Sequence, residues 1–106
     1  MPEPVRGEVW LTDLGFAAKV RPCLVLSVSP TSTERSLATL VPHTTSTRTS
    51  RFEVKVVAPF LRVGAFDSQS LVTVPLPKLI RRLGALSPQQ LRQVEGTVMQ
   101  WLGIQR

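Results

Sequence analysis

Cysteine and histidine are scarce in this chain of 106 residues, with one of each. Because Cys23 stands alone, neither a disulfide nor a thiolate metal cluster can form within one chain. The single His43 likewise argues against a histidine-based metal site. Cys23 precedes an apolar Leu-Val-Leu run, so we interpret it as a packing residue rather than a catalytic thiol. We therefore expect neither a metal nor a cofactor.

Long apolar runs and familiar catalytic motifs are absent as well. No stretch reaches the roughly 18 apolar residues that a membrane helix requires, and residues 1–4 (MPEP) lack the order of a signal peptide. We expect a soluble, cytoplasmic protein without membrane contact. The sequence has no GxGxxG, P-loop, HExxH, GxSxG or paired-cysteine motif, which argues against dinucleotide, nucleoside-triphosphate, zinc and serine-hydrolase chemistry.

Acidic residues are few, with 7 Asp and Glu against 13 Lys and Arg and a formal net charge of +6. A small domain this basic suits a polyanionic partner, either a nucleic acid or an acidic protein segment. Ten of the 13 basic residues are arginine, whose planar guanidinium fits phosphate well. Ordinary solubility charge is the alternative interpretation, since charges of roughly 2 to 8 are common in small domains.

The length fits one domain, residues 1–106, and the pattern predicts a mostly β (α+β) fold. Apolar alternation and proline or glycine corners predict strands at 7–14, 21–28, 37–42, 52–56 and 68–74, with a short element at 78–83. The segment 21–28 is almost continuously apolar, as expected for a strand buried on both faces. Pro42 should end the third strand, the polar stretch 43–51 should be an exposed loop, and residues 58–66 a connection. Five or six short strands of this kind predict a small barrel.

One helix is predicted, over about residues 87–102. Ser87 and Gln90 form a capping box, and Pro88 occupies the first helical position. Apolar residues then follow at helical spacing on one face, and Gly103 suits the position just past the helix end.

Arg21 and the threonines after Pro42 are the first candidates for chemistry. Arg21 lies where a loop meets a buried strand, so its guanidinium could clamp a phosphate; a surface arginine at a strand end is the structural alternative. Thr44, or Thr45 beside it, could donate a hydroxyl to a phosphate oxygen, or simply serve the turn. His43 could act as a base at neutral pH, or be structural.

Basic residues near these positions could neutralise an RNA backbone. Arg48 and Arg51 lie in the polar loop without a competing acid, and Arg81 and Arg82 form a second cluster beside Lys78. Each cluster could equally face solvent.

The order of these residues resembles the MazF/PemK family of toxin endoribonucleases over nearly the whole chain. The similar segments are residues 6–10 (RGEVW), 21–27 (RPCLVLS), 41–46 (VPHTTS), 52–54 (FEV) and 83–88 (LGALSP), followed by the helix. Each motif is weak alone, but their order and spacing together are fairly specific.

The resemblance implies a homodimeric SH3-like barrel that cuts single-stranded RNA at short sequence motifs without a metal. It implies that Arg21 and Thr44 are catalytic, with Thr45 the alternative to Thr44, and that attack by the neighbouring 2′-hydroxyl gives a cyclic phosphate. RNA would also contact Lys19, Arg48, Arg51, Arg81 and Arg82. It further implies a cognate antitoxin whose acidic or amphipathic segment occupies the RNA groove.

The sequence departs from the family pattern near residue 67. Many members carry an Asp-Gln pair on the penultimate strand, where this chain reads Gln69-Ser70. Asp67 lies two residues earlier, on the same face if the segment is a strand, so Asp67 could substitute, with Gln69 supporting. The loop 15–20 is also shorter and less glycine-rich than usual.

Two other functions stay open at this point. A non-enzymatic CcdB-like toxin of the same fold would bind and poison DNA gyrase. An SH3-like regulator would bind an acidic peptide instead.

Overall fold

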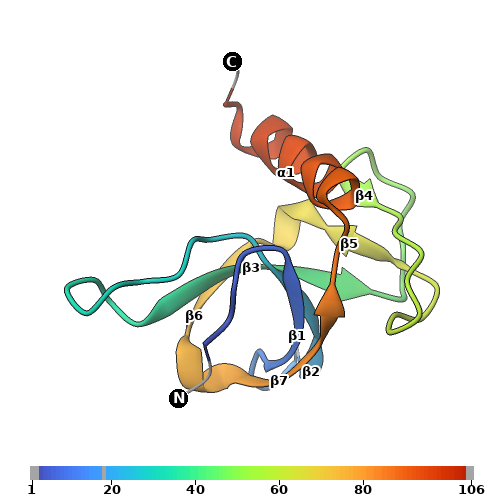
Figure 1. The fold of residues 1–106 in the computed structure, drawn as a ribbon. Coiled ribbons are helices and arrows are strands. Elements are labelled where there is room, and N and C mark those ends of the chain that lie inside the picture. Colours follow the sequence, from blue (N-terminus) through green and yellow to red (C-terminus); the bar gives the residue numbers. More distant parts are fainter. Residues whose placement is uncertain (1–2, 18, 105–106) are drawn as a thin grey trace.

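A computed structural model describes residues 3–17 and 19–104, and this part of the chain forms an antiparallel β structure with one C-terminal helix (Figure 1). The seven strands are β1 (Glu8–Asp13), β2 (Val20–Val25), β3 (Leu37–Thr44), β4 (Glu53–Val54), β5 (Ala65–Asp67), β6 (Val72–Pro75) and β7 (Leu79–Ala85). Short 3₁₀ turns, η1 (Ser68–Ser70) and η2 (Leu76–Lys78), flank β6, and α1 spans Pro88–Leu102. The mostly β prediction is confirmed, with more strands than the five or six expected.

Strand β3 is the centre of the sheet. The pairing order is β4-β5-β3-β2-β1-β7, and β6 also pairs with β3. Along one edge β3 pairs with β6 as far as Leu40 and with β5 from His43 onward. The expected end of the strand at Pro42 is therefore wrong. Pro42 lies between the two partners, where a missing N–H costs little, and β3 continues to Thr44. Closure of the sheet into a barrel stays a prediction.

Other boundaries also differ from the sequence prediction. Strand β2 ends at Val25 rather than at residue 28, and the connection expected at 58–66 contains the start of β5. The strand expected at 52–56 is only the two residues of β4, and the short element at 78–83 is the seven-residue β7. The strand expected at 68–74 is interrupted, because residues 68–70 form η1 between β5 and β6. Local apolar alternation could not reveal this break, since the chain changes sheet partners there.

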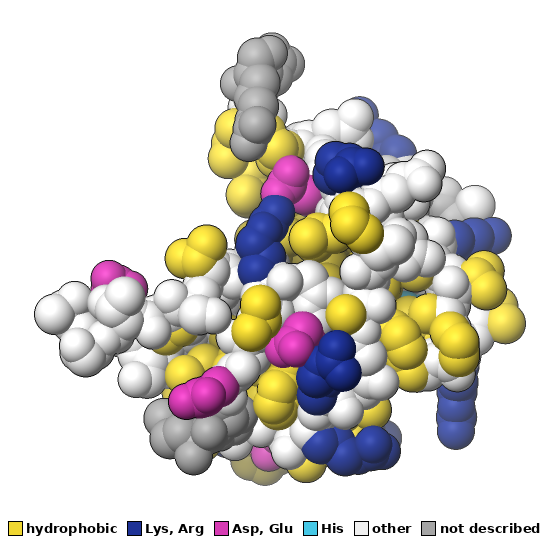
Figure 2. Space-filling view, viewed as in Figure 1, with side chains coloured by type: hydrophobic (Ala, Val, Ile, Leu, Met, Phe, Trp, Pro, Cys, Tyr) yellow, Lys and Arg dark blue, Asp and Glu magenta, His cyan; other side chains and the backbone are white. Residues whose placement is uncertain are grey.

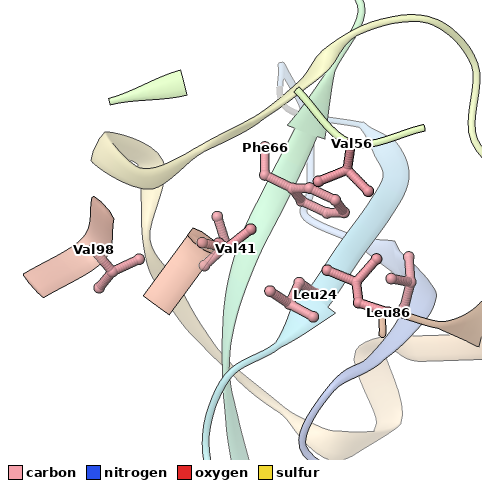
Figure 3. Close-up of a cluster of buried hydrophobic side chains, with 8 residues drawn as sticks. Leu24, Val41, Val56, Phe66, Leu86 and Val98 are labelled. Atoms are coloured by element: carbon pink, nitrogen blue, oxygen red, sulfur yellow. The ribbon is translucent and has the colours of Figure 1, made fainter. Parts of the chain in front are cut away.

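Two apolar clusters fill the opposite faces of β2 and β3. Leu24 and Val41 belong to one cluster, with Phe66 and the helix residues Val94 and Val98 (Figure 3). The neighbouring Cys23, Val25, Ala38 and Leu40 belong to the other. Strand β2 is thus buried on both faces, as its continuous apolar run predicts.

The observed helix α1 agrees closely with the helix predicted from the sequence. Ser87 Oγ accepts from Gln90 N, the Gln90 side chain accepts from Ser87 N, and Gly103 adopts a left-handed conformation with φ of 72°. Val94 and Val98 are buried, whereas Trp101 and Leu102 at the helix end are 43% and 50% exposed. No described helix is long and apolar enough to span a membrane.

Candidate functional site

Arg21 is held by a strand rather than by a loop. It is the second residue of β2 and lies opposite Thr12 of β1, whose side chain is fully buried. The Arg21 side chain is half-buried. A paired strand fixes the backbone from which the guanidinium extends.

Arg21 and Thr44 come together at the same end of the neighbouring strands β2 and β3. The last residues paired in register there are Cys23 and Pro42, and Arg21 and Thr44 each lie two residues beyond that pair, where both line the same pockets. The Thr44 hydroxyl accepts from Ser46 N at 3.1 Å, which turns the chain away from the sheet. His43 and Thr44 are therefore strand residues, and the expectation that the exposed loop begins at residue 43 is wrong; Thr45 is its first exposed residue.

Arg21 and Thr44 form the wall between two open hollows. One hollow of about 540 Å³, here called the mixed hollow, contains both basic and acidic side chains: Arg21, Arg48, Glu53 and Asp67. The other, of about 600 Å³ and here called the cationic hollow, has four basic side chains among its described lining residues: Lys19, Arg21, Arg62 and Arg81. Thr44 and Ser46 line both, so a chain lying across the two would pass Arg21 and Thr44.

Asp67 reaches the mixed hollow, but not in the way expected. It is the last residue of β5 and caps η1, accepting from Gln69 N at 3.1 Å and from Ser70 Oγ at 2.7 Å. Asp67 and Gln69 therefore do not share a strand face, since the strand ends between them. Gln69 is exposed and lines neither hollow, so only Asp67 is brought to the site.

The loop carrying Arg48 is folded around the Glu53 carboxylate. Glu53 accepts from Arg48 N at 3.0 Å and from Ser50 N at 3.2 Å, while Thr49 between them adopts a positive φ of 58°. The hydrogen bond from Arg48 N is the main cause that lowers the pKa of Glu53. The polar loop is thus ordered by an acid of β4, and the expectation that Arg48 has no competing acid is wrong.

His43 lies in the floor of the cationic hollow and is only 4% exposed. Burial, and then the charge of Arg21, lowers the pKa of His43, so the ring is neutral at pH 7. Its edge meets the Phe66 ring, with centroids 5.1 Å apart, and its Nε2 has no hydrogen-bond partner among the described residues. A neutral, buried imidazole fits a structural role better than a role that requires a charged ring.

The remaining basic candidates divide into two groups. Lys19 and Arg81 line the cationic hollow and Arg48 lines the mixed hollow. Arg51 instead stacks over Phe52 at 4.5 Å, and Arg82 pairs with Glu8 at 2.7 Å; neither lines either hollow.

Several polar and charged residues of the site are not predicted by the sequence. Arg62, Glu53 and Ser46 line the hollows, but only the tertiary fold brings them there. The polar positions after Thr44 were the only local signal for Ser46. Arg62 lay in a segment that the pattern indicated only as a connection.

Neither a thiolate nor a ready set of metal ligands is part of this site. Burial raises the pKa of Cys23 to about 12, so its thiol stays protonated. Among residues 3–17 and 19–104 there is no group of three or more His, Cys, Asp or Glu side chains that could hold a metal ion.

The fold and the site together define a small antiparallel β protein with one C-terminal helix and two open hollows that share an arginine and a threonine. A sequence profile described as PemK-like, MazF-like toxin of type II toxin-antitoxin system matches residues 5–102. The chain therefore belongs to this toxin family, and the resemblance in its sequence is confirmed.

Solved structures share the fold at low sequence identity. MazF from Deinococcus radiodurans matches with a TM-score of 0.82 and 24% identity, over 98% of this chain and 100% of its own. An endoribonuclease from a Mycobacterial species matches with a TM-score of 0.81 and 23% identity, over 100% of this chain and 97% of its own. An endoribonuclease in complex with its cognate antitoxin, also Mycobacterial, matches with a TM-score of 0.80 and 22% identity, over 100% and 99%.

Proposed function

We propose that this protein is a toxin endoribonuclease that cuts single-stranded RNA at short sequence motifs and is neutralised by a cognate antitoxin. The observation that carries the proposal is the position of Arg21 and Thr44 on the wall shared by two open hollows. An RNA strand lying across both hollows would place a phosphodiester against these two side chains. Membership in the toxin family supports this assignment.

The proposed reaction is a transesterification within the RNA. The 2′-hydroxyl gives its proton to water as its oxygen attacks the adjacent phosphorus, and the bond to the 5′-oxygen breaks as that oxygen takes a proton from water. The products are a 2′,3′-cyclic phosphate and a 5′-hydroxyl. The transition state gathers negative charge on the non-bridging oxygens, which Arg21 stabilises with its fixed positive charge. The Thr44 hydroxyl donates to the same phosphate, and holding the strand in line supplies much of the remaining acceleration.

Charge stabilisation is the main role proposed for Arg21. Arginine has a pKa above about 12, which makes it a poor base near neutral pH. His43 is neutral but buried, so it supports the floor of the site rather than contacting RNA. Asp67 holds the turn beside the mixed hollow through its bonds to residues 69 and 70.

The proposed partners follow from the charge of the groove. Its basic side chains suit an acidic segment of an antitoxin, which would compete with RNA for the same surface. Similar structures include a MazE-MazF complex from Deinococcus radiodurans, and we propose an equivalent antitoxin here. We also propose that the working form is a homodimer.

Incubation of the purified protein with long single-stranded RNA in EDTA tests the proposal. We expect cuts at a few short motifs, with cyclic phosphate and 5′-hydroxyl ends. Intact RNA, or cleavage that requires added metal, would contradict it. Inhibition of DNA supercoiling by gyrase with intact RNA would instead support the CcdB-like alternative, and tight binding of an acidic peptide without RNA competition would support the regulator.

A further inference from the structure

The two hollows beside Arg21 differ in charge. Glu53 and Asp67 line the mixed hollow together with Arg48, so its charges largely balance. The cationic hollow has Lys19, Arg62 and Arg81 in addition to Arg21, and its described lining residues include no acid. A hollow of about 600 Å³ lined in this way is an unbalanced positive site next to the reaction centre.

The three additional cations come from three separate parts of the chain. Lys19 precedes β2, Arg62 lies between β4 and β5, and Arg81 lies in β7; all three are exposed. Across the described ranges 3–17 and 19–104, the ion pairs are Arg6–Glu95 and Arg82–Glu8, and neither involves these three residues. Their charges are available to an anion from solvent.

Strand alternation separates Arg81 from its neighbour. Arg81 pairs in register with Leu11, and Leu11, Arg81 and Leu83 all line the cationic hollow. Arg82 pairs in register with Trp10 and donates to Glu8 instead. One arginine of this adjacent pair is therefore neutralised while the other faces the hollow.

The segment that carries Arg62 is anchored at both ends by close packing on a glycine. A Cβ built on Gly84 would lie 2.4 Å from the Phe60 ring, so that ring rests directly on β7. A Cβ on Gly64 would lie 2.1 Å from the Thr44 carbonyl oxygen, so the chain there rests against the end of β3. Arg62 lies between these two anchors and is held beside the hollow.

We propose that the cationic hollow binds the RNA backbone on one side of the scissile phosphate, with Arg62 and Arg81 neutralising flanking phosphates. The inference rests on the proposed function, whose substrate it locates. Phosphate contacts from Lys and Arg position a nucleic acid without reading its sequence, and each makes binding more sensitive to salt. The hollow thus supplies affinity rather than the choice of cleavage motif.

Equilibrium binding of uncleavable 2′-O-methyl RNA tests this assignment apart from catalysis. The double variant Arg62→Ala/Arg81→Ala is compared with Arg35→Ala/Arg92→Ala, which removes the same charge at exposed positions outside both hollows. At physiological salt we expect the first variant to lose about tenfold or more in affinity, equally for RNAs of different sequence. Its slope of log affinity against log salt should shrink by about 1.4, since each single-strand phosphate contact contributes about 0.7.

The control variant should retain the affinity and slope of the wild-type protein within about twofold. Equal losses in the two double variants, or a loss confined to one RNA sequence, would overturn the assignment. A wild-type protein that binds RNA in this pattern without cutting it would contradict the proposed function but not the backbone site. An unchanged melting temperature shows that each variant is folded. If Arg62→Ala/Arg81→Ala does not fold, Arg62→Gln/Arg81→Gln, which keeps most of each side chain, takes its place.

Discussion

The mixed and cationic hollows share Arg21 and Thr44 but are built by different physical means. The outer wall of the mixed hollow is a polar loop whose backbone N–H groups are gathered on the Glu53 carboxylate. One wall of the cationic hollow is the segment from Phe60 to Gly64. Phe60 packs on Gly84, and Gly64 packs against the Thr44 carbonyl oxygen. One wall therefore depends on an ionised acid and the other on the absence of a side chain at a glycine. The two should therefore respond to different perturbations.

Loss of the Arg21 guanidinium, which both hollows share, should have the largest effect on RNA cleavage. Arg21→Ala removes the charge that stabilises the transition state on either side, so we expect cleavage of single-stranded RNA to slow by about 100-fold or more. Arg21→Lys keeps a charge but not the planar fork, and it should recover only part of the rate. Rates within a few-fold of wild type for Arg21→Ala would remove Arg21 from the mechanism.

A methyl group at Gly64 should damage the wall that depends on packing. The new Cβ would meet the Thr44 carbonyl oxygen at 2.1 Å and His43 Cε1 at 2.8 Å, and the carbonyl is backbone that cannot turn aside. We expect Gly64→Ala to lower the free energy of unfolding by about 2–3 kcal/mol in urea denaturation.

Gly96→Ala is the matched control for this substitution. Gly96 lies within α1 and has open space around its position, so alanine there should stabilise by about 0.5–1 kcal/mol. Equal effects of the two substitutions would mean that Gly64 is not a close-packing position.

Low pH should lower the free energy of unfolding through His43, which lies in the floor of the cationic hollow. Because burial lowers the pKa of this histidine, the unfolded chain binds the proton more readily than the folded protein. The contribution to stability is complete above the ordinary histidine pKa of about 6.5 and falls as pH drops below it. The free energy of unfolding measured from pH 8 to pH 5 should decline less for His43→Asn than for the wild-type protein, and parallel curves would contradict this.

Glu53→Gln should disturb only the mixed hollow, with the smallest effect. The amide loses the charge that holds Arg48 N and Ser50 N, so hydrogen exchange at these two amides should become faster. Cleavage should slow by only a few-fold and RNA salt dependence should not change.

The order of this loop should also depend on pH. Since the folded pKa of Glu53 is lowered, its contribution is present above the ordinary value of 4.5 and is lost as pH falls through the folded pKa. Acidification below 4.5 should therefore reproduce the faster exchange of Glu53→Gln in the wild-type protein. Unchanged exchange in both cases would show that Glu53 does not order the loop.

The parts of this molecule that local chemistry determines were predictable from sequence. The helix followed from Ser87, Gln90 and Gly103, whose capping interactions involve only neighbours within a few residues. The buried strand β2 followed from its continuous apolar run, whereas the catalytic roles of Arg21 and Thr44 stay predictions. The turn at Ser68–Ser70 and the extension of β3 through Pro42 depend on which strands pair, which local periodicity does not encode.

The mixed charge of one hollow and the positive charge of the other could not be predicted for the same reason. Arg62 is distant in sequence from Arg81, and packing of Phe60 on Gly84 brings the segment that carries Arg62 against β7. Arg81 and Arg82 look equivalent in the sequence, but register with β1 gives only Arg82 the carboxylate of Glu8.

Single-turnover cleavage with increasing enzyme concentration tests most directly whether Arg21 performs the chemistry while the cationic hollow supplies binding. For Arg62→Ala/Arg81→Ala, the cleavage rate should approach the wild-type rate once the RNA is saturated with enzyme. For Arg21→Ala, it should remain about 100-fold or more below the wild-type rate at every enzyme concentration. A saturated Arg21→Ala protein that cuts at the wild-type rate would contradict the account.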